Sequence, residues 1–106
     1  MRLVDGVTEA EGQPRSYALH ANAPNPFNPE TMVRFDLPEA AVVRLEVYDV
    51  LGQRVRTLVS GDLAPGSHQV VWDGRDEQGV PVGSGTYVCR MQAGSFVQVR
   101  RMVLLK

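Results

Sequence analysis

The sequence contains very little of what several classes of protein need. Cys89 is the only cysteine among 106 residues, so no disulfide can form within the chain, and we expect Cys89 to be a small buried strand residue. Eleven basic and twelve acidic residues give a net charge of -1, which excludes a strongly basic nucleic-acid-binding protein. The longest apolar runs, such as 102–105, are far shorter than the roughly 20 residues of a membrane-spanning helix. We therefore expect no nucleic-acid partner and no membrane insertion.

Isoleucine is absent, and the apolar residues are mostly 17 valines and 9 leucines. The β-branched side chain of valine favours strands over helices. Glycine and proline punctuate the chain about every ten residues, and apolar and polar residues alternate between them, which is the two-residue period of a strand. In the stretch 41–49, for example, Val43, Leu45 and Val47 face one way. Glu46 lies on the opposite face, which we expect to be solvated.

This pattern predicts seven strands and no helix. Short strands with glycine and proline turns are typical of an all-β, immunoglobulin-like antiparallel β-sandwich. Residues 1–16 are polar and lack a period, so we predict a leader or linker over 1–16 and the folded domain over 17–106. In the last strand the alternation breaks phase at Arg100-Arg101, where a bulge would turn the flanking apolar pairs inward. The predicted strands are Tyr17–Ala21, Thr31–Leu37, Val42–Asp49, Gln53–Val59, Ser67–Asp73, Gly85–Gln92 and Phe96–Leu105.

Residues that could perform chemistry are scattered along the chain. His20 and His68 lie in different predicted strands and Cys89 is alone, so neither a zinc site nor a Cys/His nucleophile pair has support. The segment 83–85 fails the nucleophile-elbow and phosphate-loop patterns and is typical of a tight turn. The loop Asp73–Gly79 holds three acids that could bind calcium, but Asp and Gly also favour turns, which is the interpretation we prefer. We expect no catalytic, cofactor-binding or metal-binding residue, and a recognised module rather than an enzyme.

The C-terminal part of the chain is basic and apolar. Residues 90–106 contain Arg90, Arg100, Arg101 and Lys106 and no acidic residue. A solvated strand face would explain this pattern. The functional alternative is an exposed edge strand that pairs with a receptor by strand addition.

Four separated motifs make the sequence recognisable. They are Asn25-Pro26-Phe27-Asn28-Pro29, a turn with Asp49, Gly52 and Arg54, the start of a strand at Gly85 and Tyr87, and the terminal Arg101-Met102-Val103-Leu104-Leu105-Lys106. In this order and spacing, residues 17–106 resemble the C-terminal sorting domain, type A, of the type IX secretion system. Gln53 departs slightly from the family, whose members often have Arg or Lys after the glycine.

The resemblance implies an immunoglobulin-like C-terminal module of a secreted protein from the Bacteroidetes and their relatives. Such a module directs an N-terminal passenger from the periplasm through the outer-membrane type IX translocon, so the protein would be periplasmic in transit and then secreted or at the cell surface. A sortase-like peptidase would remove the module within the linker or attach the passenger to the surface. A homodimer through edge strands remains open. The resemblance places recognition on Arg100, Arg101, Met102, Val103, Leu104, Leu105 and Lys106.

Two other functions compete with sorting. The segment 71–87, with Trp72, Asp73 and Gly74, also resembles the immunoglobulin-like domain of the flagellar hook-capping protein, which implies a structural role in assembly. An accessory carbohydrate-binding module of a secreted hydrolase would need a row of exposed aromatic residues. Most of the seven aromatic residues alternate as core residues do, and Tyr48 is the exception on the wetter face.

Overall fold

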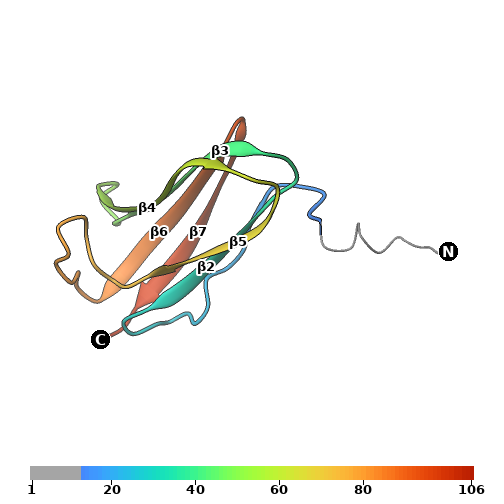
Figure 1. Cartoon of the computed structure of the whole chain (residues 1–106). Coiled ribbons are helices and arrows are strands. Elements are labelled where there is room, and N and C mark those ends of the chain that lie inside the picture. The colour runs from blue at the N-terminus through green and yellow to red at the C-terminus, as the bar shows by residue number, and fades with distance from the viewer. Residues whose placement is uncertain (1–12) are drawn as a thin grey trace.

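The computed structural model describes residues 13–106, which form two packed sheets (Figure 1). The predicted leader over 1–16 therefore lies largely outside the described residues, and its limit stays a prediction. Within the described part, Tyr17 stacks on Phe96 with ring centroids 5.3 Å apart, so the chain is already packed on the domain at this point. Among residues 13–106 there is no helix that is long and apolar enough to cross a membrane.

The all-β prediction is confirmed. The element that departs most from its predicted bounds is the fourth strand, which continues beyond Val59 through Gly61 because Gly61 pairs with Val43. The strands are β1 (Ala18–Leu19), β2 (Thr31–Leu37), β3 (Ala41–Tyr48), β4 (Arg54–Leu63), β5 (Gly66–Trp72), β6 (Gly85–Ala93) and β7 (Phe96–Leu104).

The strands form an immunoglobulin-like sandwich of two antiparallel sheets, as expected. One sheet has the order β1-β2-β5 and the other the order β4-β3-β6-β7. The predicted inward face of β3 is confirmed, since Val43, Leu45 and Val47 are fully buried. Cys89 is also buried, and desolvation raises the pKa of its thiol to about 12, so this cysteine acts as a small core residue.

Aromatic side chains fill the end of the core where β5, β6 and the segment before β2 meet. The buried ring of Trp72 lies 5.6 Å from Phe27 and 5.3 Å from Tyr87, measured between centroids. The indole N–H of Trp72 donates to the carbonyl of Arg75 at 3.0 Å, and the Tyr87 hydroxyl donates to the carbonyl of Gly83 at 2.7 Å. The second bond has the form of the tyrosine corner of immunoglobulin-like sandwiches.

The predicted bulge in β7 is wrong. β6 and β7 pair without a register shift, and Val97 and Val99 point outward with 48% and 55% of their surface exposed. Gln98 and Arg100, which alternate with these valines along β7, take the inward positions. Their side chains form hydrogen bonds with the backbone of Leu19 in β1. Polar residues can occupy this face because β1 supplies hydrogen-bond partners for them.

The structure places bulges in the pairing of β3 with β4 instead. The register shifts between Leu45 and Glu46 and again between Val47 and Tyr48. Each shift puts an extra residue into β4 opposite β3, which increases the local twist of the sheet. The twisted hairpin ends in the turn at Asp49–Gly52, at the edge of the site described next.

Candidate recognition surface

The segment Asn25–Phe27, which we call the clasp, forms hydrogen bonds with the edge of the terminal strand β7 that faces away from β6. The Asn25 side chain accepts from the Val103 amide at 3.0 Å and donates to the Arg101 carbonyl at 3.3 Å. Phe27 continues the pairing, because its amide donates to the Val103 carbonyl at 2.9 Å and its carbonyl accepts from the Leu105 amide at 3.0 Å. In Figure 1 this blue-to-cyan segment passes beside the red strand β7. Asn25 therefore imitates a strand backbone, and Phe27 anchors the clasp in the core.

The other residues of the motif Asn25–Pro29 lie beside the clasp, and only Pro29 has a clear structural role. Asn28 and Pro26 are exposed, and Pro29 brings its carbonyl against the loop after β5. A Cβ at Gly74 would lie 2.9 Å from the Pro29 carbonyl oxygen, and the φ of Gly74 is +75°, so this position requires glycine. The resemblance between Asn25–Pro29 and a known motif thus corresponds to a unit that holds the C-terminus in place.

The clasp also bears on the alternative that the terminal strand is an exposed edge that pairs with a receptor by strand addition. This edge is not free at 101–105. The backbone groups of 101–105 that point away from β6 are already bonded to Asn25 and Phe27, so a partner strand would have to displace them. The side chains of the predicted recognition residues separate into different roles. Met102 and Leu104 are fully buried in the core, and the Arg100 guanidinium donates to the Leu19 carbonyl at 2.8 Å.

Three of the seven predicted recognition residues have exposed side chains that are neither buried in the core nor bonded to β1: Arg101, Leu105 and Lys106. Leu105 is 54% exposed, and the Lys106 amide donates to the Ser84 hydroxyl at 2.9 Å, which fixes the end of the chain beside the turn before β6. Val103 is half-buried. Gly85 begins β6 as the register partner of Leu104.

The opposite edge of the same sheet carries a second cap. The amide of Glu77 donates to the Val55 carbonyl of β4 at 3.1 Å, and the Glu77 carboxylate accepts from the Thr57 amide at 2.6 Å. Glu77 thus occupies one donor and one acceptor of the β4 edge. Capped edges resist pairing with other strands, so a homodimer that pairs through 55–57 of β4 or 101–105 of β7 would first have to release these bonds.

Two loops with the same spacing of Asp and Gly lie next to each other at this end of the domain. In Asp49–Gln53 and in Asp76–Val80 the aspartate carboxylate accepts two backbone amides, and the glycine has a φ of +81°. The first loop explains the motif residues Asp49 and Gly52 as a self-bonded turn. Sequence reasoning missed the second copy, although the pattern Asp-x-x-Gly is visible in the sequence.

The carboxylates of the suspected calcium loop Asp73–Gly79 are bonded to the protein's own donors. Asp73 accepts from the Arg75 amide and from the Arg56 guanidinium, while Asp76 and Glu77 hold the backbone groups described above. Within residues 13–106 no cluster of three or more His, Cys, Asp or Glu side chains is arranged to hold a metal ion. The arrangement is that of a turn.

Glu46 lies on the outer face as predicted, but the expectation that it is solvated is wrong. It is 3% exposed, because Arg44 and Arg54 cover its carboxylate at 3.2 and 3.5 Å and the Tyr48 hydroxyl donates to it at 2.8 Å. Burial acts to raise the pKa of Glu46, but the hydrogen bond from Tyr48 and the charge of Arg44 outweigh it and lower this pKa. The motif residue Arg54 therefore serves this cluster.

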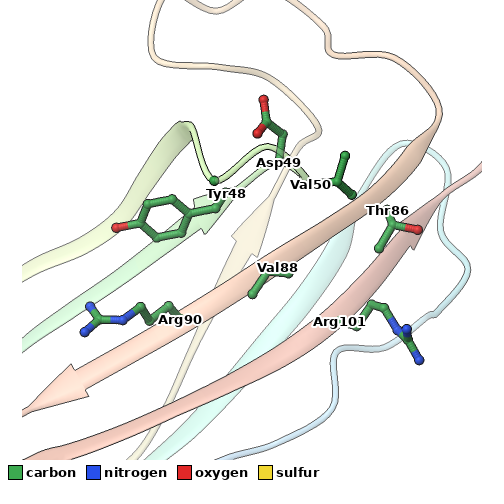
Figure 2. A pocket seen from close by; sticks show the side chains of 8 residues that line it. Tyr48, Asp49, Val50, Thr86, Val88, Arg90 and Arg101 are labelled. Carbon is green, nitrogen blue, oxygen red and sulfur yellow. The ribbon is translucent and has the colours of Figure 1, made fainter.

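A pocket of about 670 Å³ opens on the same face, beside the Glu46 cluster (Figure 2). Its floor is Val88 of β6, and the guanidinium groups of Arg90 and Arg101 extend away on opposite sides of it. The remaining lining comes from the β3–β4 turn and the start of β6: Tyr48, Asp49, Val50, Gly52 and Thr86.

A row of exposed aromatic rings is absent from the described residues, which include all seven aromatics of the chain. Phe27, Phe35, Trp72 and Tyr87 are buried, and the other three are partly buried. The Tyr48 hydroxyl is bound to Glu46. The stacking platform that a carbohydrate-binding module needs is therefore not present in residues 13–106.

The two sheets and the tyrosine corner define an immunoglobulin-like β-sandwich module. The profile of the family described as FlgD Ig-like domain matches residues 21–95. The chain belongs to this family, and its predicted similarity to the hook-capping protein is confirmed.

Solved structures of three bacterial proteins are similar to the chain. FlgD from P. aeruginosa has 27% identity and a TM-score of 0.56, with 70% of this chain and 59% of that chain covered. Dimeric latent PorU from Porphyromonas gingivalis has 20% identity and a TM-score of 0.61, with 84% and 9% covered. PorZ, an essential bacterial surface component of the type IX secretion system of the same organism, has 16% identity and a TM-score of 0.54, with 93% and 13% covered.

At these identities, the likeness to PorU and PorZ shows a shared fold. The chain spans 59% of the FlgD chain and about a tenth of the PorU and PorZ chains, so it corresponds to a part of each. No curated protein matches the chain.

Proposed function

We propose that this chain is a C-terminal sorting domain, which directs a passenger across the outer membrane by the type IX system and is then removed or left at the cell surface. The observation that carries the proposal is the clasp. Asn25 and Phe27 bind the backbone of 101–105, so the two motifs on which the resemblance mainly rests form one structural unit. The shared fold with PorZ, a component of that system, supports the same conclusion.

The translocon would read the exposed part of this unit. Arg101, Leu105 and Lys106 present their side chains to solvent, whereas Met102 and Leu104 serve the core. A sortase-like peptidase would act ahead of the domain, in the segment 1–16. The domain itself would be recognised and would perform no catalysis, because its acidic loop residues are engaged in turns and the pocket beside the Glu46 cluster is a surface hollow of the sheet.

A structural role in assembly, like that of the hook-capping protein, is the second candidate. The family match over 21–95 and the 27% identity with FlgD favour it. The matched residues end before β7 begins at Phe96. Sorting requires the exposed residues of the terminal strand region, and a purely structural module does not, so substitutions there separate the two candidates.

The test is export of a reporter fused between a periplasmic signal peptide and residues 1–106 in a bacterium with a type IX system. Truncation at Gln98 would remove the buried Met102 and Leu104, so a folded variant is needed instead. We choose Arg101→Glu, with Arg34→Glu, another exposed strand arginine, as the control of equal charge.

Sorting predicts that the wild type and the control leave the cell, while the variant stays in the periplasm as a folded protein. Loss of the domain's mass from the exported reporter would report its removal. If the wild-type fusion stays in the periplasm although the domain is folded, the sorting proposal fails and the assembly module takes its place.

A further inference from the structure

The outer face of the four-stranded sheet is a regular grid of arginine, valine and tyrosine. Strand pairing places residues of four strands side by side in rows, with all of these side chains on the face away from the core. The first row crosses the sheet as Arg54, Tyr48, Val88 and Arg101, and the second as Thr57, Glu46, Arg90 and Val99.

The arginines of this grid differ in how they are paired. Arg44 and Arg54 share the carboxylate of Glu46. Arg90 and Arg101 make no ion pair with any carboxylate among residues 13–106, and the Arg90 side chain donates a hydrogen bond to the neutral amide oxygen of Gln92 at 3.3 Å. The half of the face over β6 and β7 therefore presents two positive charges without a counter-charge on that half.

The two unpaired arginines stand on either side of an apolar floor. Val88 lies directly opposite Arg101 in the β6–β7 register, and Arg90 pairs with Val99 two residues before Arg101. Diagonal neighbours of this kind are about 7 to 8 Å apart. In Figure 2 the guanidinium groups of Arg90 and Arg101 point away from each other, with Val88 between them. This arrangement suits a ligand with two anionic groups that flank an apolar group.

Backbone pairing at the edges of this sheet is blocked in part. Asn25 and Phe27 cover β7 at 101–105, and Glu77 covers β4. The uncovered part of this sheet that lies around the pocket is its side-chain face. Exposed apolar residues extend the surface around the pocket, since Val99 is 55% exposed and Val50 and Leu51 in the β3–β4 turn are 72% and 80% exposed.

We propose that this face binds an extended acidic peptide segment of a partner protein. Two carboxylates of the segment pair with Arg90 and Arg101, and an apolar side chain between them rests on Val88. The pocket of about 670 Å³ is within the size range of ligand sites, and charge complementarity selects an acidic partner. The inference goes beyond the proposed function, because it concerns binding and holds for a sorting domain or an assembly module.

The probe is a fluorescein-labelled octapeptide of alternating aspartate and valine, titrated into the full chain and followed by fluorescence anisotropy. Octapeptides of alternating serine and valine and of alternating lysine and valine serve as the neutral and basic comparisons. The variant is Arg90→Ala/Arg101→Ala, and the matched control is Arg15→Ala/Arg34→Ala, which removes the same charge elsewhere. A urea titration of each protein verifies that it is folded.

We expect the acidic peptide to bind tighter than the other two, and to weaken as salt rises because salt screens the ion pairs. Each exposed pair contributes up to about fivefold in affinity, so the double variant should lose about tenfold and the control less than twofold. Equal binding of the neutral peptide, or equal losses in variant and control, would overturn the proposal. Binding to phosphatidylglycerol vesicles without binding to the acidic peptide would also overturn it, in favour of a lipid surface.

The outcome is independent of the export assay. A domain that exports the reporter but ignores the acidic peptide refutes only the peptide site. A domain that binds the peptide but stays in the periplasm refutes only the sorting proposal.

Discussion

The clasp on the terminal strand gives the most direct test of how the two ends of the domain are joined. In Asn25→Ala the Val103 amide loses its acceptor at 3.0 Å and the Arg101 carbonyl loses its donor at 3.3 Å. A hydrogen bond contributes about 0.5 to 1.5 kcal/mol net, and the longer bond is near the upper limit of good geometry. Because both sites are exposed, water replaces the lost partners. We expect the free energy of unfolding to fall by about 1 to 2 kcal/mol.

The assay is a urea titration together with amide hydrogen exchange. A loss of about 1 to 2 kcal/mol moves the urea midpoint by about 0.5 to 1 M for a protein of this size. The Val103 amide should exchange faster in the variant, whereas the Val47 amide in the centre of the sheet should change only with global stability. Asn28→Ala is the matched control, since Asn28 is exposed and its side chain makes no hydrogen bond within residues 13–106. Equal midpoints for the two variants, or unchanged exchange at Val103, would refute the reasoning.

Three further substitutions test the core, a turn and the buried acid. Trp72→Ala should cost about 3 to 5 kcal/mol by urea titration, because the indole is fully buried between two aromatic rings. Gly74→Ala should cost more than about 1 kcal/mol, whereas Gly83→Ala, at a site with open space, should cost clearly less. Because the pKa of Glu46 is lower in the folded protein, its carboxylate stabilises the fold at pH values above the ordinary pKa of 4.5. This stabilisation is lost as the pH falls through the lowered pKa of the folded state. Glu46→Gln should therefore reduce the slope of stability against pH below about pH 5, and an unchanged slope would contradict the lowered pKa of Glu46.

Local alternation was enough to predict the strands, because each strand has one face in the core and the side-chain period is fixed by backbone geometry. The set Val43, Leu45 and Val47 illustrates this, since burial follows the pattern directly. In β7 the same method failed. Gln98 and Arg100 occupy inward positions because the backbone of β1, about 80 residues away in the sequence, bonds to them. Alternation alone cannot detect such distant partners.

The candidate site was harder to predict than the fold for the same reason. Glu46 looked like a solvated residue, and its burial depends on a covering arginine that strand pairing brings from β4. The role of Asn25 depends on two backbone groups near the end of the chain. By contrast, the turn at Asp49–Gly52 and its copy at Asp76–Gly79 are local, so the repeated spacing of Asp and Gly is visible in the sequence, although sequence reasoning did not use it for the second turn.

The clasp also determines when the domain can finish folding. Asn25 and Val103 are 78 residues apart in the chain, and Leu19 and Arg100 are 81 apart. Contacts over such separations form slowly, because a long loop must close before they contribute free energy. During synthesis these contacts can form only after residues 100–103 have been added to the chain. The N-terminal part of the domain, including β1, therefore stays without its partner until β7 is present, and we expect the contacts of Asn25 with β7 to form late in folding.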